Sequence, residues 1–148
     1  MRRSALKLMG GLFMLLLTTA PLLSRAQSTK GIVFMEDAWT AALKKAAQQK
    51  KYVFVDAYAT WCGPCKMLKK TTFVDKTAAA FYNKNFVNLA MDMEKGQGPA
   101  LAAQWALEAY PTLLIFDSKG KLVLKSVGFI QAPDLIKFGK QALAAKKS

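Results

Sequence analysis

The sequence predicts an α/β fold built on one central mixed sheet with helices on both faces. Apolar runs typical of buried strands alternate with helical segments along most of the chain. Strand–helix–strand units of this kind imply right-handed parallel crossovers. A final pair of strands joined by a short turn adds an antiparallel strand to the sheet. The 148 residues suffice for one such domain, which we place at residues 27–148.

The elements can be placed in order along the chain. Residues 36–51 lack Gly and Pro, are rich in Ala, Lys and Gln, and space their apolar side chains as a helix does. Residues 52–58 form a β-type run long enough for a buried strand, and residues 86–91 form a second. The other expected helices cover residues 62–73, 77–85, 99–107 and 133–147, and the last two strands cover 112–116 and 121–125.

Residues 1–26 have the composition of a secretory signal peptide. Arg2, Arg3 and Lys7 form a positively charged start, an apolar stretch follows, and Ser24-Arg25-Ala26 resembles a cleavage site with small residues at alternate positions. We expect cleavage after Ala26 and export to the periplasm or another extracytoplasmic compartment. The alternative is an uncleaved membrane anchor, although the apolar stretch is shorter than the ~20 residues that a spanning helix needs.

Composition excludes several classes of function. The chain has no histidine, which rules out Ser-His-Asp and Cys-His catalysis and any zinc site that contains histidine. Two cysteines cannot supply four thiolates to a metal. The net charge of +13 attracts anionic partners, but no arginine follows Arg25, so bidentate arginine recognition of bases is impossible beyond it. We expect no cofactor, no metal and no nucleic-acid partner.

Cys62 and Cys65 indicate thiol–disulfide chemistry. A bridge between them closes a four-residue loop, which stabilises a fold by only about 2 kcal/mol, against about 4.7 for a loop of a hundred residues. Cys62 stands at the start of a predicted helix, where free backbone N–H groups and the helix dipole stabilise a thiolate. Cys65 follows one helical turn later on the same side, and Gly63 and Pro64 shape the tight helix entry. Such a pair can attack a disulfide to form an intermolecular bond, and it can then release the partner by internal attack on that bond.

Around these cysteines the sequence resembles the thioredoxin family. The string Trp61-Cys62-Gly63-Pro64-Cys65-Lys66 is the family's hallmark, and Asp56 lies six residues before Cys62, where thioredoxins carry a buried carboxylate. Tyr110-Pro111-Thr112 resembles the cis-proline loop, and Gly128 matches the glycine after the last strand. The resemblance covers about residues 33–146 and implies a thioredoxin-like fold.

The resemblance also implies a role for each matched residue. Cys62 would be the nucleophile and Cys65 the resolving thiol, and together they would form the redox-active disulfide. Asp56 would take the proton from Cys65 through water, since burial raises a carboxyl pKa toward neutrality. The residues implied in substrate binding are Trp61, Gly63, Pro64, Tyr110 and Pro111.

Two positions depart from the family pattern. Tyr58 stands where many thioredoxins have tryptophan, and Asn88 is aligned with the lysine that cytosolic thioredoxins place beside the buried acid. Without that lysine, we expect Asp56 to lack a cationic partner and to have a higher pKa.

The function that the sequence predicts is that of an exported thiol–disulfide oxidoreductase working as a reductant. Relatives that are strongly oxidising, and the isomerases, usually carry histidine before the second cysteine, and this chain carries Pro64 there. We expect a monomer that reduces disulfides of cell-envelope proteins and that receives electrons from a membrane thiol–disulfide donor. The alternatives are a disulfide oxidase or isomerase, or a thioredoxin-like binding module without turnover.

Overall fold

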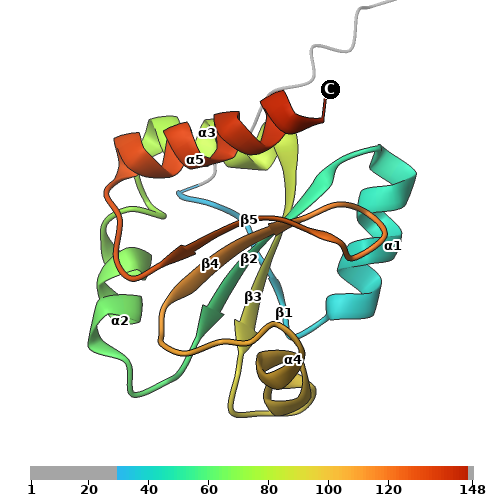
Figure 1. The fold of residues 1–148 in the computed structure, drawn as a ribbon. Helices are drawn as coiled ribbons and strands as arrows, with labels where there is room; N and C mark the ends of the chain where they lie inside the picture. The colour runs from blue at the N-terminus through green and yellow to red at the C-terminus, as the bar shows by residue number, and fades with distance from the viewer. Residues whose placement is uncertain (1–29, 147–148) are drawn as a thin grey trace, which may run out of the picture.

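A five-stranded mixed sheet forms the centre of the molecule in the computed structural model, which describes residues 30–146 (Figure 1). The strand order is β1-β3-β2-β4-β5. The strands are β1 (Met35–Glu36), β2 (Tyr52–Tyr58), β3 (Phe86–Asp92), β4 (Thr112–Phe116) and β5 (Leu122–Val127). The helices are α1 (Trp39–Gln49), α2 (Gly63–Lys70), α3 (Lys76–Asn85), α4 (Gly98–Gln104) and α5 (Ala132–Ala145). The predicted α/β class is therefore confirmed.

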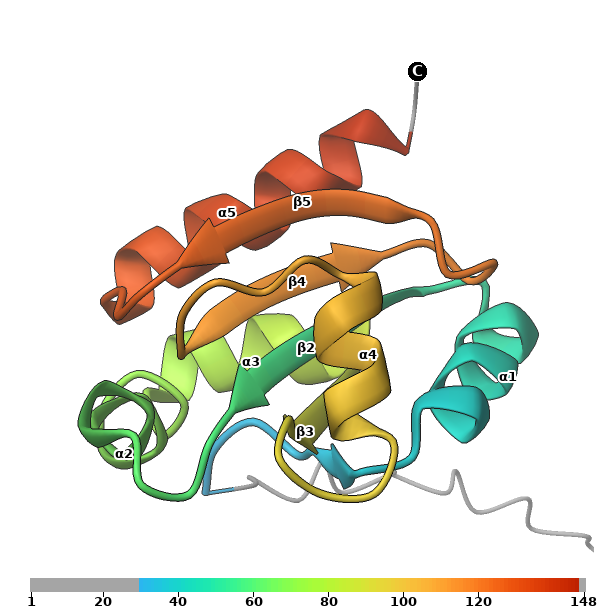
Figure 2. The same cartoon turned by 60° about the horizontal axis from the view of Figure 1, so that its bottom comes forward.

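Two apolar clusters hold helices against opposite faces of the sheet. One cluster joins Phe54 and Leu113 of the sheet to Leu68, Tyr82 and Leu135, which belong to α2, α3 and α5. The other cluster joins the opposite sheet face to α1 and α4 through Ala42, Ala46, Leu101 and Trp105. In Figure 2, α4 lies in front of the sheet and α3 lies behind it. Alternation of side chains along β2 and β4 supplies both clusters, because successive residues point to opposite faces.

Strand directions bring several chain segments to one edge of the sheet. Strands β1 and β2 both run parallel to β3, so their carboxyl ends meet at the same edge. Strand β4 is antiparallel to β2 and begins at that edge, where β5 ends. The loops after β1, β2 and β3, the loop before β4 and the end of β5 therefore converge there. This edge carries the cysteine pair.

The structure differs from the sequence-based prediction at the N-terminal end of the domain. Residues 35–36 form the short edge strand β1 beside β3, and α1 begins only at Trp39. The predicted helix over 36–51 therefore begins too early. A strand of two residues carries no alternation pattern, and its pairing with Leu89 and Ala90 is fixed by distant residues. The other predicted strands and helices are present with boundaries moved by a few residues.

The predicted signal peptide lies outside the described residues. Within residues 30–146, no helix is long and apolar enough to cross a membrane.

A close backbone contact fixes the loop that follows β3. A Cβ atom at Gly98 would lie 2.1 Å from the Asp92 carbonyl oxygen and 2.6 Å from the Met93 Cα. The first turn of α4 can therefore approach the end of β3 only because residue 98 is glycine. The loop between them, residues 93–97, is held at the edge that carries the cysteine pair.

Candidate active site

Cys62 and Cys65 form a disulfide at the start of α2. Their sulfur atoms are 2.10 Å apart and their Cα atoms 5.3 Å apart. Cys62 is the N-cap residue of α2, and its Sγ accepts a hydrogen bond of 3.2 Å from the backbone N–H of Cys65. The predicted placement of the first cysteine at a helix N-terminus is confirmed. A thiolate formed there on reduction would receive the same N–H group and the positive end of the helix dipole.

The oxidised pair is covered by its surroundings. Cys62 is 2% exposed and Cys65 is 1% exposed. The two cysteines cluster with Ala59, and the rings of Tyr58 and Tyr110 pack against them. A disulfide partner must therefore approach at the surface immediately around Cys62.

The residues next in sequence to Cys62 form that surface. Trp61 is 66% exposed, and Gly63 and Pro64 are also exposed. A Cβ atom at Gly63 would meet no other atom within 4 Å, so the backbone here is open to an approaching chain.

The loop before β4 lies beside the cysteine pair, as the sequence predicts. The Tyr110–Pro111 peptide bond is cis, which confirms the expected cis-proline loop. The Pro111 carbonyl oxygen accepts a 2.8 Å hydrogen bond from the N–H of Gly128 at the end of β5. Tyr110 contacts the cysteine cluster and lies with its ring centroid 6.2 Å from that of Trp61. Three segments far apart in sequence thus meet at one site.

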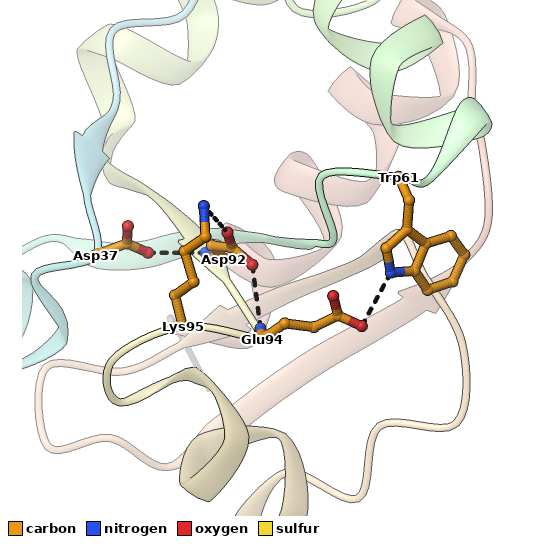
Figure 3. Close-up of polar contacts among 5 residues, drawn as sticks. All are labelled: Asp37, Trp61, Asp92, Glu94 and Lys95. Carbon is orange, nitrogen blue, oxygen red and sulfur yellow. Dashed lines mark hydrogen bonds and ion pairs between the residues drawn. The ribbon is translucent and has the colours of Figure 1, made fainter.

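Trp61 is hydrogen-bonded to a network of acidic side chains that the sequence did not predict. The Trp61 indole N–H donates a 2.9 Å hydrogen bond to Glu94 Oε1 (Figure 3). Asp92 accepts from the Glu94 N–H and pairs with Lys95 at 3.3 Å, and its own N–H donates to Asp37. Glu94 follows β3 by two residues. The sequence signal that could have identified Glu94 is its position just after a buried strand, because β3 ends at the edge of the sheet where the loop after β2 begins.

Asp56 is fully buried on the middle strand of the sheet. Its side chain lies on the same face of β2 as Phe54, which is the face covered by α2. Neither carboxyl oxygen has a hydrogen-bond partner among the described residues. Burial raises the pKa of Asp56 from 3.8 to about 7, while Lys69 lowers it and Glu36 raises it further. A carboxyl group with this pKa exchanges a proton readily near neutral pH.

Asn88 lies on the same face of the sheet as Asp56, but it is not the residue paired with Asp56 across β3. Asp56 is paired with Ala90 across β3, and Asn88 is paired with Phe54, two residues earlier. The Asn88 side chain instead donates to the Val33 carbonyl oxygen at 3.3 Å and to Asn83 at 3.2 Å. The expected rise in the pKa of Asp56 is present, although the charge of Lys69 on α2 acts against it.

The fold and the cysteine pair define a class of proteins, the thioredoxin-like proteins with a redox-active disulfide. A family model described as "Thioredoxin-like" matches residues 34–118. Thioredoxin-1 of Saccharomyces cerevisiae is 42% identical over 100 residues, covering 68% of this chain and 85% of that protein. The chain belongs to the thioredoxin family.

Two further relatives carry names that refer to disulfide exchange. A Bacteroides thetaiotaomicron protein proposed to be a disulphide isomerase is 46% identical in sequence. The structural alignment with its solution structure covers 78% of this chain and 95% of that protein's chain, with a TM-score of 0.70. The thiol:disulfide interchange protein DsbD of Colwellia psychrerythraea is 35% identical over 97 residues, which span 62% of this chain and only 16% of DsbD. With the Cys62–Cys65 disulfide, these relatives identify the chain as a thiol–disulfide oxidoreductase.

Proposed function

We propose that this protein is an exported reductant that transfers two electrons from the Cys62–Cys65 dithiol to disulfides of cell-envelope proteins. The observation that carries the proposal is the pair itself, with Cys62 at the N-cap of α2 and Gly63-Pro64 between the two cysteines. No cofactor is needed, since the thiols hold both electrons.

In the first half of the reaction, the Cys62 thiolate attacks one sulfur of the substrate disulfide. A bond forms between Cys62 Sγ and that sulfur, the substrate S–S bond breaks, and the other substrate sulfur leaves as a thiolate. The N–H of Cys65 and the N-terminus of α2 stabilise the Cys62 thiolate before the attack.

In the second half, Cys65 releases the reduced substrate. Asp56 accepts the Cys65 proton through water, and the Cys65 thiolate attacks Cys62 Sγ. The mixed disulfide breaks, the substrate leaves as its second thiolate, and the Cys62–Cys65 disulfide forms. A dithiol donor must then reduce this disulfide, and we assign that role to a membrane thiol–disulfide protein. The similarity of the chain to part of DsbD supports this assignment.

The surface around the cysteine pair suits a polypeptide substrate. Trp61, Met67, Val127 and Phe129 are large apolar residues exposed on the loop after β2, on α2 and at the end of β5. The cis-proline loop lies between the end of β2 and the end of β5, because β4 pairs with both strands and Gly128 is hydrogen-bonded to Pro111. An extended chain could lay its backbone along the loop and its apolar side chains on these residues.

Export is the second part of the proposal. Residues 1–26 carry the charge and apolar pattern of a signal peptide, and we infer a mature domain of residues 27–148. Expression of the full chain in a bacterial host and N-terminal sequencing of the envelope fraction test this. We expect a mature chain that begins at Gln27. A chain that retains Met1 in the membrane fraction would support the anchored form, and a chain confined to the cytosol would contradict export.

The reduction potential of the Cys62–Cys65 pair separates a reductant from an oxidant. We expect a value near that of thioredoxin, about −270 mV, rather than the value of about −120 mV found for a strong oxidant. Equilibration of the protein with glutathione or dithiothreitol buffers, followed by alkylation and mass analysis, measures it. A potential above about −200 mV would place the protein with the oxidases and isomerases.

Disulfide isomerisation is the second candidate function. It is favoured by the 46% identity to the Bacteroides thetaiotaomicron protein. A scrambled ribonuclease assay distinguishes the two: an isomerase restores native pairing with catalytic amounts of enzyme and no added reductant, whereas a reductant consumes its own dithiol stoichiometrically.

A further inference from the structure

We propose that Lys69 on α2 is the electrostatic partner of Asp56, and that the ring of Tyr58 holds it in that position. Lys69 is then a positioning residue for the release step of the reaction. This inference deepens the proposed function and rests on it, since it concerns the proton that Asp56 takes from Cys65.

The residues paired directly with Asp56 on the neighbouring strands are apolar. Across β3 its paired residue is Ala90, and across β4 it is Leu113. Phe54, two residues earlier on the same face of β2, is part of the apolar cluster under α2. Both carboxyl oxygens of Asp56 lack a hydrogen-bond partner among residues 30–146. Any charge that compensates an ionised Asp56 must therefore come from α2 or from the ends of the neighbouring strands.

Lys69 has the position and the contact required. It lies one helical turn after Cys65, so the two side chains emerge from the same side of α2. Its Nζ stands 3.5 Å from the centroid of the Tyr58 ring, a distance at which a cation is attracted to the ring face. Tyr58 follows Asp56 by two residues on β2, and its side chain shares that face of the sheet. The ring thus keeps the ammonium group above the strand that carries Asp56.

The charged and titratable groups around Asp56 give Lys69 a distinct role. These groups are Glu36 on β1, Tyr58 on β2, Asp92 at the end of β3, and Lys69 with the two cysteines on α2. The residues paired directly with Asp56 are Ala90 on β3 and Leu113 on β4. Burial and Glu36 both raise the pKa of Asp56, and Lys69 acts against them. Lys69 itself is exposed, so solvent screens part of its effect. It keeps a larger fraction of Asp56 ionised at neutral pH.

The test is the pH profile of the release step in Lys69→Gln. Single-turnover reduction of a model disulfide by the reduced protein, followed by stopped flow between pH 5.5 and 9, gives the rate at which the mixed disulfide resolves. We expect the midpoint of the profile to move upward by about half a pH unit, and release at pH 7 to slow about twofold. Lys69→Arg should restore the wild-type profile, because it keeps the cation over the ring.

Matched variants separate this role from a general charge effect. Lys70→Gln removes the same charge from the next position of α2 and should leave the midpoint unchanged. Tyr58→Phe should keep the profile, whereas Tyr58→Leu should shift it as Lys69→Gln does. In an Asp56→Asn background, Lys69→Gln should have no further effect on the profile.

Several results would overturn the inference. An unchanged midpoint in Lys69→Gln would do so, as would an equal shift in Lys70→Gln. A shift that persists in the Asp56→Asn background would show that Lys69 acts on a cysteine rather than on Asp56. Failure of the proposed function is seen separately, because the wild-type protein would then not reduce the disulfide in the same assay.

Discussion

Cys65→Ser is expected to abolish turnover and to leave substrates covalently attached to Cys62. The variant keeps the attacking sulfur at the N-cap of α2 and removes the thiol that releases the mixed disulfide. Internal attack by a well-placed group benefits from effective molarities that reach about 10⁵ M, so an external thiol at millimolar concentration replaces Cys65 poorly. Release should therefore slow by several orders of magnitude. Non-reducing gels of the affinity-purified variant should show disulfide-linked adducts, which dithiothreitol should cleave.

The matched control is Cys62→Ser, which retains Cys65. Cys65 lies inside α2 and lacks the N-cap position that stabilises a thiolate at Cys62, so this variant should form few adducts. Equal trapping by the two variants would reverse the roles assigned to the cysteines. If Cys65→Ser forms no adducts while Cys62 still reacts with iodoacetamide, the protein binds partners without exchange. Adducts made only with cytosolic proteins in a natural host would contradict a substrate in the cell envelope.

Local sequence was sufficient to place the cysteine pair in the fold. The run at 52–58 has the composition of a buried strand, and the cysteines follow it at the start of a helix with proline in its first turn. The turn between β4 and β5 was equally local, because Asp117 accepts hydrogen bonds from the N–H groups of Lys119 and Lys121. In each case the residues that determine the structure are neighbours in the chain.

Contacts between distant segments could not be predicted in the same way. Strand β1 exists only because residues 35–36 meet Leu89 and Ala90 across some fifty positions of the chain. The bond from Trp61 to Glu94 and the contact of Lys69 with Tyr58 likewise depend on how strands and helices pack. The hydrogen bonds of Asn88 to Val33 and Asn83 depend on the same packing.

Asp56→Asn is expected to slow release of the mixed disulfide while leaving the first attack by Cys62 nearly intact. General-base assistance is worth about 10²–10⁴-fold, and the loss should be largest near neutral pH. At higher pH, Cys65 ionises without help, so the two proteins should converge. Stopped-flow rates of attack and release between pH 6 and 9 measure both steps. Asp134→Asn, which changes an exposed acid in the first turn of α5, is the matched control and should behave as the wild type. Equal release rates in wild type and Asp56→Asn would assign Asp56 no part in proton transfer.

Stability provides an independent measure of the same carboxyl group. The pKa of Asp56 is raised by burial from 3.8 in the unfolded chain to about 7 in the folded one, so the folded state binds more protons between these values. The stability that the protonated group contributes is complete below about pH 4 and is lost as the pH rises toward 7 and above. The shift corresponds to about 4 kcal/mol between acid and alkaline conditions.

In Asp56→Asn this pH dependence of stability disappears, so the melting temperature of the variant relative to the wild type should rise steadily from pH 4 to pH 8. Thermal melts of the oxidised proteins isolate the effect, because neither cysteine titrates in the disulfide. A difference in melting temperature that stays constant over this range would mean that the Asp56 carboxyl is not held in a desolvated site.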